Sequence, residues 1–364
     1  MKYALPLGEF REAMLDRLLA FLWRQWSALG VLGDSGTEDQ WILDPEPLLV
    51  FSLELGRYEP RLFDEVLAWL ETNGHWLDTA RLRQILSAQE GGALRVIGGA
   101  LRHAQMHGGE RKWKNLALFC HNRKPPMGGF LEPLFKEKSG KFYPRAEGDK
   151  IDPSFQAFDL NRPRLNIQKK AKEVPVNAHA NLRFLMRSLF GVGAKSEALL
   201  YLMTHESGHP REIADSVGLF WLSLQQALAD LSRSGLVLTK PSGGKKVNYW
   251  ISQKKWWEFL TPIDYEAGPF PRWLDWIAIF RGLANAWRTV DALVGNPSSE
   301  YMAGSKLQDS LEFVALEFAR AGLFVSVPGS GLPSDMRQEI ALRFLGEIIG
   351  LKEGPVVQAG AIHG

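Results

Sequence analysis

The chain has 364 residues, of which 45% are hydrophobic and 23% are charged, a composition typical of globular proteins with several hydrophobic cores. Its single cysteine, Cys120, excludes an intrachain disulfide and favours a reducing compartment, so we expect a cytoplasmic protein. Charged side chains interrupt residues 1–26, and no run of about 18 apolar residues occurs. We therefore expect neither a signal peptide nor a membrane span.

The net charge of +2 conceals an uneven distribution along the chain. Residues 1–94 carry a net charge of −7, residues 95–172 carry +10, residues 173–260 carry +3 and the remainder carries −4. Contact with a polyanion, if the protein makes one, is therefore expected in the middle of the chain.

Residues 1–94 are predicted to form an acidic, helical N-terminal domain. Apolar residues recur at spacings of three and four over residues 8–30, and Gly30 ends that helix. A second helix is predicted to begin at Pro45, with Asp44 before it as the N-cap. A third ends at Asn73 and Gly74, and a fourth follows over 78–90.

Residues 95–180 differ in composition from the N-terminal region and are predicted to be a basic connecting segment. Proline and glycine recur throughout residues 125–175, which is typical of an extended arm rather than of regular structure. Two of its lysines, Lys169 and Lys170, are candidates for non-specific contacts with phosphates.

Residues 181–260 have the clearest pattern of helix-end and turn signals in the chain. The stretch "PREIADSVG" begins with Pro210 at a favoured first-turn position and ends at Gly218. The next helix buries a stripe of leucines and ends at Gly235. Alternating apolar residues on both sides of "PSGGKK" then predict a β-hairpin.

This order of elements resembles the winged helix-turn-helix of transcriptional regulators of the arsenical-repressor and multiple-antibiotic-resistance-regulator type. The resemblance covers about 70 residues and is carried by Glu212, Ile213, Ala214, Val217, Gly218, Leu219, Leu224, Leu228, Leu231, Ser234, Gly235, Leu236 and Val237, with Lys245, Lys246, Tyr249 and Trp250 on the wing. It implies a mainly α, multi-domain protein with a central unit of three helices and a β-hairpin wing. It also implies a DNA-binding transcriptional regulator.

Under this hypothesis the helix after Gly218 enters the major groove of double-stranded DNA. Its polar side chains would contact bases, since glutamine can form two hydrogen bonds with adenine, and cations around it would contact phosphates. The candidate residues are Ser223, Gln225, Gln226, Lys240, Lys245, Lys246, Arg183, Arg187, Lys169 and Lys170.

Phe220 and Trp221 suggest an alternative, because they stand where the resembling regulators carry small polar residues. In that alternative the unit is a scaffold, for example in an antitoxin-like subunit, and the two rings anchor a protein partner. Burial of both rings beneath a positive face would favour DNA, whereas exposed rings on a neutral face would favour a protein.

Residues 261–364 are predicted to form a helical C-terminal domain that serves dimerisation or ligand binding. The stripe Trp276, Ile279, Phe280, Leu283 and Trp287 fits either a homodimer interface or a domain core. Five tryptophans could also line a ligand pocket between the preceding unit and the C-terminal helices: Trp256, Trp257, Trp273, Trp276 and Trp287.

No catalytic constellation is recognised, and we expect neither an enzyme nor a bound cofactor. His103 and His107 would share one helix face, as zinc ligands often do, and Cys120 and His121 lie nearby in sequence. Because two adjacent side chains rarely reach one metal and no C-x-x-C pair occurs, the sequence favours surface histidines beside a buried thiol.

Overall fold

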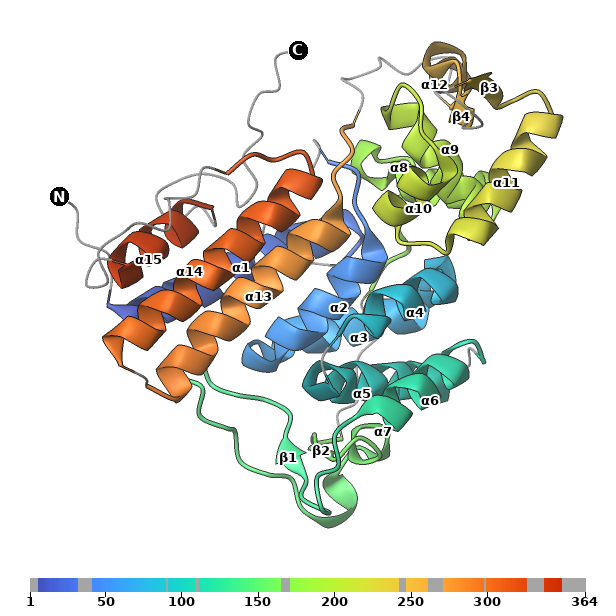
Figure 1. The fold of residues 1–364 in the computed structure, drawn as a ribbon. Coiled ribbons are helices and arrows are strands. Elements are labelled where there is room, and N and C mark those ends of the chain that lie inside the picture. The colour runs from blue at the N-terminus through green and yellow to red at the C-terminus, as the bar shows by residue number, and fades with distance from the viewer. Residues whose placement is uncertain are drawn as a thin grey trace.

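The computed structural model describes residues 6–31, 41–89, 91–108, 111–164, 171–241, 247–260, 271–297, 299–325 and 337–348. Within these ranges the protein is mainly helical, as the sequence predicts, and its few strands are short (Figure 1). No helix in these ranges is both long and apolar enough to cross a membrane.

The elements follow one another in this order along the chain. The helices are α1 (Leu7–Ala28), α2 (Pro45–Leu55), α3 (Pro60–Asn73), α4 (Thr79–Ser87), α5 (Gly91–His107), α6 (Trp113–Arg123), α7 (Pro153–Gln156), α8 (Leu182–Phe190), α9 (Ala194–Thr204), α10 (Pro210–Val217), α11 (Trp221–Arg233), α12 (Gln253–Leu260), α13 (Trp276–Gly295), α14 (Glu300–Arg320) and α15 (Arg337–Ile348). Short 3₁₀ helices are η1 (Gly56–Tyr58), η2 (Gly74–Trp76), η3 (Gly148–Lys150) and η4 (His179–Asn181). The strands are β1 (Glu132–Pro133), β2 (Leu160–Asn161), β3 (Leu238–Pro241) and β4 (Val247–Trp250), with β1 parallel to β2 and β3 antiparallel to β4.

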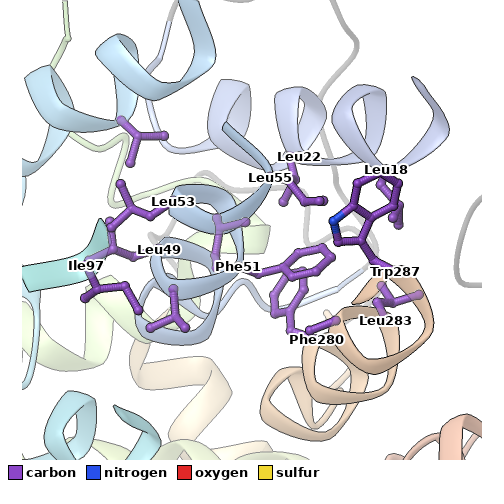
Figure 2. Packing of buried hydrophobic residues seen from close by; sticks show 14 of the residues in the cluster. Leu18, Leu22, Leu49, Phe51, Leu53, Leu55, Ile97, Phe280, Leu283 and Trp287 are labelled. Carbon is purple, nitrogen blue, oxygen red and sulfur yellow. The ribbon is translucent and has the colours of Figure 1, made fainter. Parts of the chain in front are cut away.

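Three of the four predicted domains share one hydrophobic core. The core joins α1 to α6, the segment around β1 and β2, and the C-terminal helices α13 to α15. Helix α2 lies at its centre: Figure 2 shows Leu49 and Leu53 directed toward Ile97 of α5, and Phe51 toward Phe280 of α13. We therefore describe these elements as one main body.

The aromatic stripe of α13 belongs to this core. Trp276, Ile279, Phe280, Leu283 and Trp287 are all at most 4% exposed. Phe280 packs against Phe21 and Phe51, and Trp287 packs edge-on against Tyr58. Of the two roles predicted for the stripe, the domain core is the one observed, so a homodimer would need another surface.

Part of the region predicted as a connecting arm packs onto the main body, whereas residues 137–150 are mostly exposed. Phe155 and Phe158 are buried against the glycine pair of α5: a Cβ on Gly99 would lie 2.6 Å from Phe155 Cδ1, and one on Gly98 would lie closer still to Phe158. Glycine pairs weaken a helix, but here they let two rings approach the helix backbone. The segment that contains Phe155 and Phe158 is therefore folded onto α5 and is not a free linker.

We expect Gly98→Ala to lower the free energy of unfolding by about 1–3 kcal/mol, because the added methyl group overlaps the buried Phe158 ring. Gly92→Ala in the same helix is the matched control. No atom lies within 4 Å of the added Cβ there, and stability should stay equal or rise by up to about 1 kcal/mol. Urea-induced unfolding followed by circular dichroism measures both, and equal behaviour of the two variants would contradict this packing.

Candidate functional site

Residues 182–260 form a separate unit, the helix-and-hairpin module, with a hydrophobic core of its own. It contains α8 to α12 and the hairpin β3–β4, in which Leu238 pairs with Trp250 and Pro241 with Val247. A third extended segment precedes α10, where the backbone groups of Gly208 and Tyr249 exchange hydrogen bonds of 2.9 and 3.0 Å. In Figure 1 the module stands beside the main body, at the upper right.

The turn between α10 and α11 has the geometry that the sequence predicts. Helix α10 begins at Pro210, and the His209 side chain accepts a hydrogen bond from the Arg211 backbone N–H. It ends at Gly218, whose φ of 68° is left-handed and therefore favours glycine. Ala214 is buried in the core of the module, and its carbonyl accepts from the Leu219 N–H.

One side of this turn is fixed against the main body. The Arg81 Nε of α4 donates to the Val217 carbonyl, and a Cβ on Gly218 would lie 2.5 Å from Ile277 Cδ1 of α13. The opposite side of α11 faces outward, and Figure 1 shows this helix at the edge of the molecule. The main body therefore fixes the position of the start of α11 and leaves its outer side accessible to solvent.

The open end of α11 presents an apolar turn made of Phe220, Trp221 and Leu222. These side chains are 58%, 45% and 54% exposed. The predicted base-contacting residues Ser223, Gln225 and Gln226 are exposed on the same helix, and the Gln226 amide donates to Asp230. The structure thus brings the polar and apolar candidates together on one surface.

Positive charge is scarce on this surface. Helix α11 has no lysine or arginine before Arg233, which forms an ion pair with Asp230 at 3.2 Å. On the neighbouring α10, Arg211 is exposed together with two carboxylates, those of Glu212 and Asp215. Among the predicted phosphate contacts, Lys240 is exposed on β3, whereas Lys169, Lys170, Lys245 and Lys246 lie outside the described residues.

Arg183 and Arg187 do not face solvent, so their predicted contact with phosphates is wrong. Both belong to a buried ion network where α8 and α9 of the module meet α2 and α4 of the main body. Its members are Asp44, Glu46, Arg81, Arg183, Arg187 and Glu197, and each is at most 2% exposed.

Arg187 is the centre of this network. Its guanidinium binds Glu46 at 2.8 Å and Glu197 at 2.6 Å, and it donates to the Trp76 carbonyl at 2.7 Å. Burial alone would raise the pKa of Glu46, but Arg187 and Arg81 hold it well below its usual range. Arg183 pairs with Glu197 at 2.8 Å and lies over the Trp273 ring. The network therefore couples the module to the main body.

Two of the cavities that border the described part of the module bear on the predicted residues. One, of about 650 Å³, lies between α9, α12 and the segments before α13 and after α14, and Trp257 and Trp273 are among its lining residues. Trp276 and Trp287 are instead buried in the core of the main body, whereas Trp256, buried in the core of the module, borders the second cavity. The other is an apolar groove of about 350 Å³, which Leu236, Leu238 and Phe259 help to line.

The histidine pair of α5 lies away from the module. His103 and His107 stack at a ring separation of 4.1 Å, and Glu71 of α3 joins them. Cys120 is buried, and burial raises the pKa of its thiol to about 12. Among the described residues, neither Cys120 nor His121 belongs to a group of potential metal ligands.

Comparisons of the chain with protein-family models, curated proteins and solved structures found no match. A function must therefore be inferred from the residues and geometry of the chain itself.

Proposed function

We propose that the helix-and-hairpin module is a winged helix whose apolar turn binds a protein partner. The order of α8 to α11 followed by the hairpin supports the winged-helix assignment. So does the β-bridge between Gly208 and Tyr249, which adds an extended segment beside the hairpin before α10. In this proposal the fold of a DNA reader serves as a scaffold that presents the start of α11.

The exposure of Phe220 and Trp221 carries the proposal. Nine of the eighteen large hydrophobic side chains exposed in the described residues belong to this module. Clustered exposed apolar side chains mark interaction sites, and aromatic residues dominate the energetics of protein interfaces. Protein–DNA interfaces are instead polar and strongly positive, unlike the cation-free first turns of α11.

Site-specific photo-crosslinking in the native cells tests this proposal. A benzophenone amino acid at position 221 should yield one discrete adduct with a protein, while the same group at Leu316, exposed on α14, should not. The captured protein is then purified and its affinity for the unmodified chain is measured by calorimetry. A second copy of this chain would be recognised by sedimentation analysis as a homodimer. Adducts with nucleic acid alone, or a captured protein that does not bind when purified, would contradict the proposal.

Double-stranded DNA is the second candidate, favoured by the exposed side chains of Ser223, Gln225 and Gln226 on the helix that winged-helix regulators insert into the groove. Lys240, near the turn end of β3, would add a phosphate contact. A regulator of this kind, acting in the cytoplasm as a dimer, remains the rival to the protein-docking proposal.

The salt dependence of DNA binding separates the two candidates. Fluorescence anisotropy with a pool of random duplexes should show weak binding if the module docks a protein. Six to ten phosphate contacts would instead weaken binding by about 10³–10⁵-fold between 50 and 200 mM salt. Tight binding with that dependence, reduced by Gln225→Ala and Lys240→Ala, would favour the regulator.

A further inference from the structure

Two helices of the main body bring three potential metal ligands together. His103 and His107 lie one turn apart on α5, and Glu71 lies on α3. One nitrogen or oxygen atom from each residue lies within 4.8 Å of the others. These residues come from segments more than 30 positions apart, so only the fold assembles them.

Neighbouring groups orient both imidazoles. The Nδ1 of His103 lies 3.2 Å from Asp152 Oδ2, and the Nδ1 of His107 lies 2.9 Å from the His103 carbonyl oxygen. A carbonyl can only accept, so His107 Nδ1 carries the proton and its Nε2 offers a lone pair. A carboxylate or carbonyl behind the ring is the usual support of a metal-bound histidine.

The charge around the cluster also suits a divalent cation. Three carboxylates, those of Glu71, Asp152 and Asp64, gather around His103 and Arg162. Arg162 neutralises one of them. Both ring nitrogens of His103 face carboxylate oxygens, which only accept, so this ring carries two protons, and a metal ion would replace the proton on Nε2 and face two negative charges. The side chains of His103 and Glu71 are only 4% exposed, so solvent screens this charge weakly.

We propose that Glu71, His103 and His107 bind a divalent transition-metal ion of the Zn²⁺ type. The ligands would be the Nε2 atoms of both histidines and a carboxylate oxygen of Glu71. Glu71 Oε1 already lies 3.1 Å from His103 Nε2, so the ion would bind between these two atoms. Two imidazoles and one carboxylate are a ligand set that Zn²⁺ accepts, with a fourth position left to water. Because His107 is exposed, that position is open to solvent.

Calorimetric titration of the untagged, metal-free protein with ZnCl₂ tests this site, with Co²⁺ absorption as the probe of tetrahedral geometry. We expect one equivalent of Zn²⁺ to bind and to raise the midpoint of thermal unfolding. His107→Ala should weaken binding by about 10–100-fold or more, and Glu71→Gln should act in the same direction.

His121→Ala is the matched control, because His121 is exposed on the adjacent α6 and lies outside the cluster. This variant should bind Zn²⁺ like the wild type. Circular dichroism checks that His107→Ala remains folded, as expected for an exposed side chain. Absence of stoichiometric binding, or equal affinity of the wild type and His107→Ala, would overturn the proposal and leave an ion-paired histidine cluster.

Discussion

Replacing Arg187 by methionine is expected to lower the free energy of unfolding by about 3–5 kcal/mol. The substitution leaves Glu46 and Glu197 buried without their shared cation, and removing one partner of a buried ion pair typically costs that much. Urea-induced unfolding followed by circular dichroism measures the loss. Lys195→Met is the matched control, since Lys195 is exposed on α9 and its replacement should change stability by less than about 0.5 kcal/mol.

Two further measurements separate an ion network from simple loss of packing. In Arg187→Met with Glu197→Gln, the combined loss should be smaller than the sum of the single losses, because the second change removes a charge that the first left unpaired. Strict additivity would contradict the network.

The pH dependence of stability gives the second readout. Both carboxyl pKa values are lowered in the folded protein, so the stabilisation is present above the ordinary carboxyl pKa and is lost as the pH falls. Without Arg187 the pKa values of both carboxyls rise in the folded protein, so the loss of stability on acidification should become smaller.

Replacing Trp221 or Phe220 by alanine is expected to weaken binding of the protein partner by about 30-fold or more in each case. Exposed aromatic residues at the centre of an interface commonly contribute 2 kcal/mol or more on truncation. Because both rings are largely exposed, neither change should lower the stability of the chain itself.

Gln226→Ala on the same helix is the control for this prediction. The Gln226 amide is engaged with Asp230, so its removal should change the affinity for the partner only slightly. Calorimetry with the purified partner measures all three variants. Equal affinities for the wild type and Trp221→Ala would show that the apolar turn is not the binding surface.

The local pattern of the chain predicted much of the module. Pro210, Gly218 and Gly235 mark helix ends because their backbone preferences act over a few residues, and the helices and hairpin were predicted from such signals. The exposed positions of Ser223, Gln225 and Lys240 were also expected from the same pattern.

Features that depend on distant residues were not predicted. From the sequence, Arg183 and Arg187 are expected to contact phosphates. In the structure they lie near Glu46, which is 141 positions from Arg187, and local sequence patterns do not reveal such a distant neighbour. Glu71 was missed beside His103 for the same reason. The glycine pair Gly98 and Gly99 of α5 is the one local signal of a distant contact, since small residues in a helix can indicate the close approach of another segment.

Hydrogen–deuterium exchange of the chain, alone, with its purified partner and with duplex DNA, tests the central claim most directly. A protein-docking surface predicts slower amide exchange over residues 219–226 when the protein partner is added, and no change in that segment with DNA. Protection of the same segment by DNA, or protection by the partner only elsewhere in the chain, would contradict it.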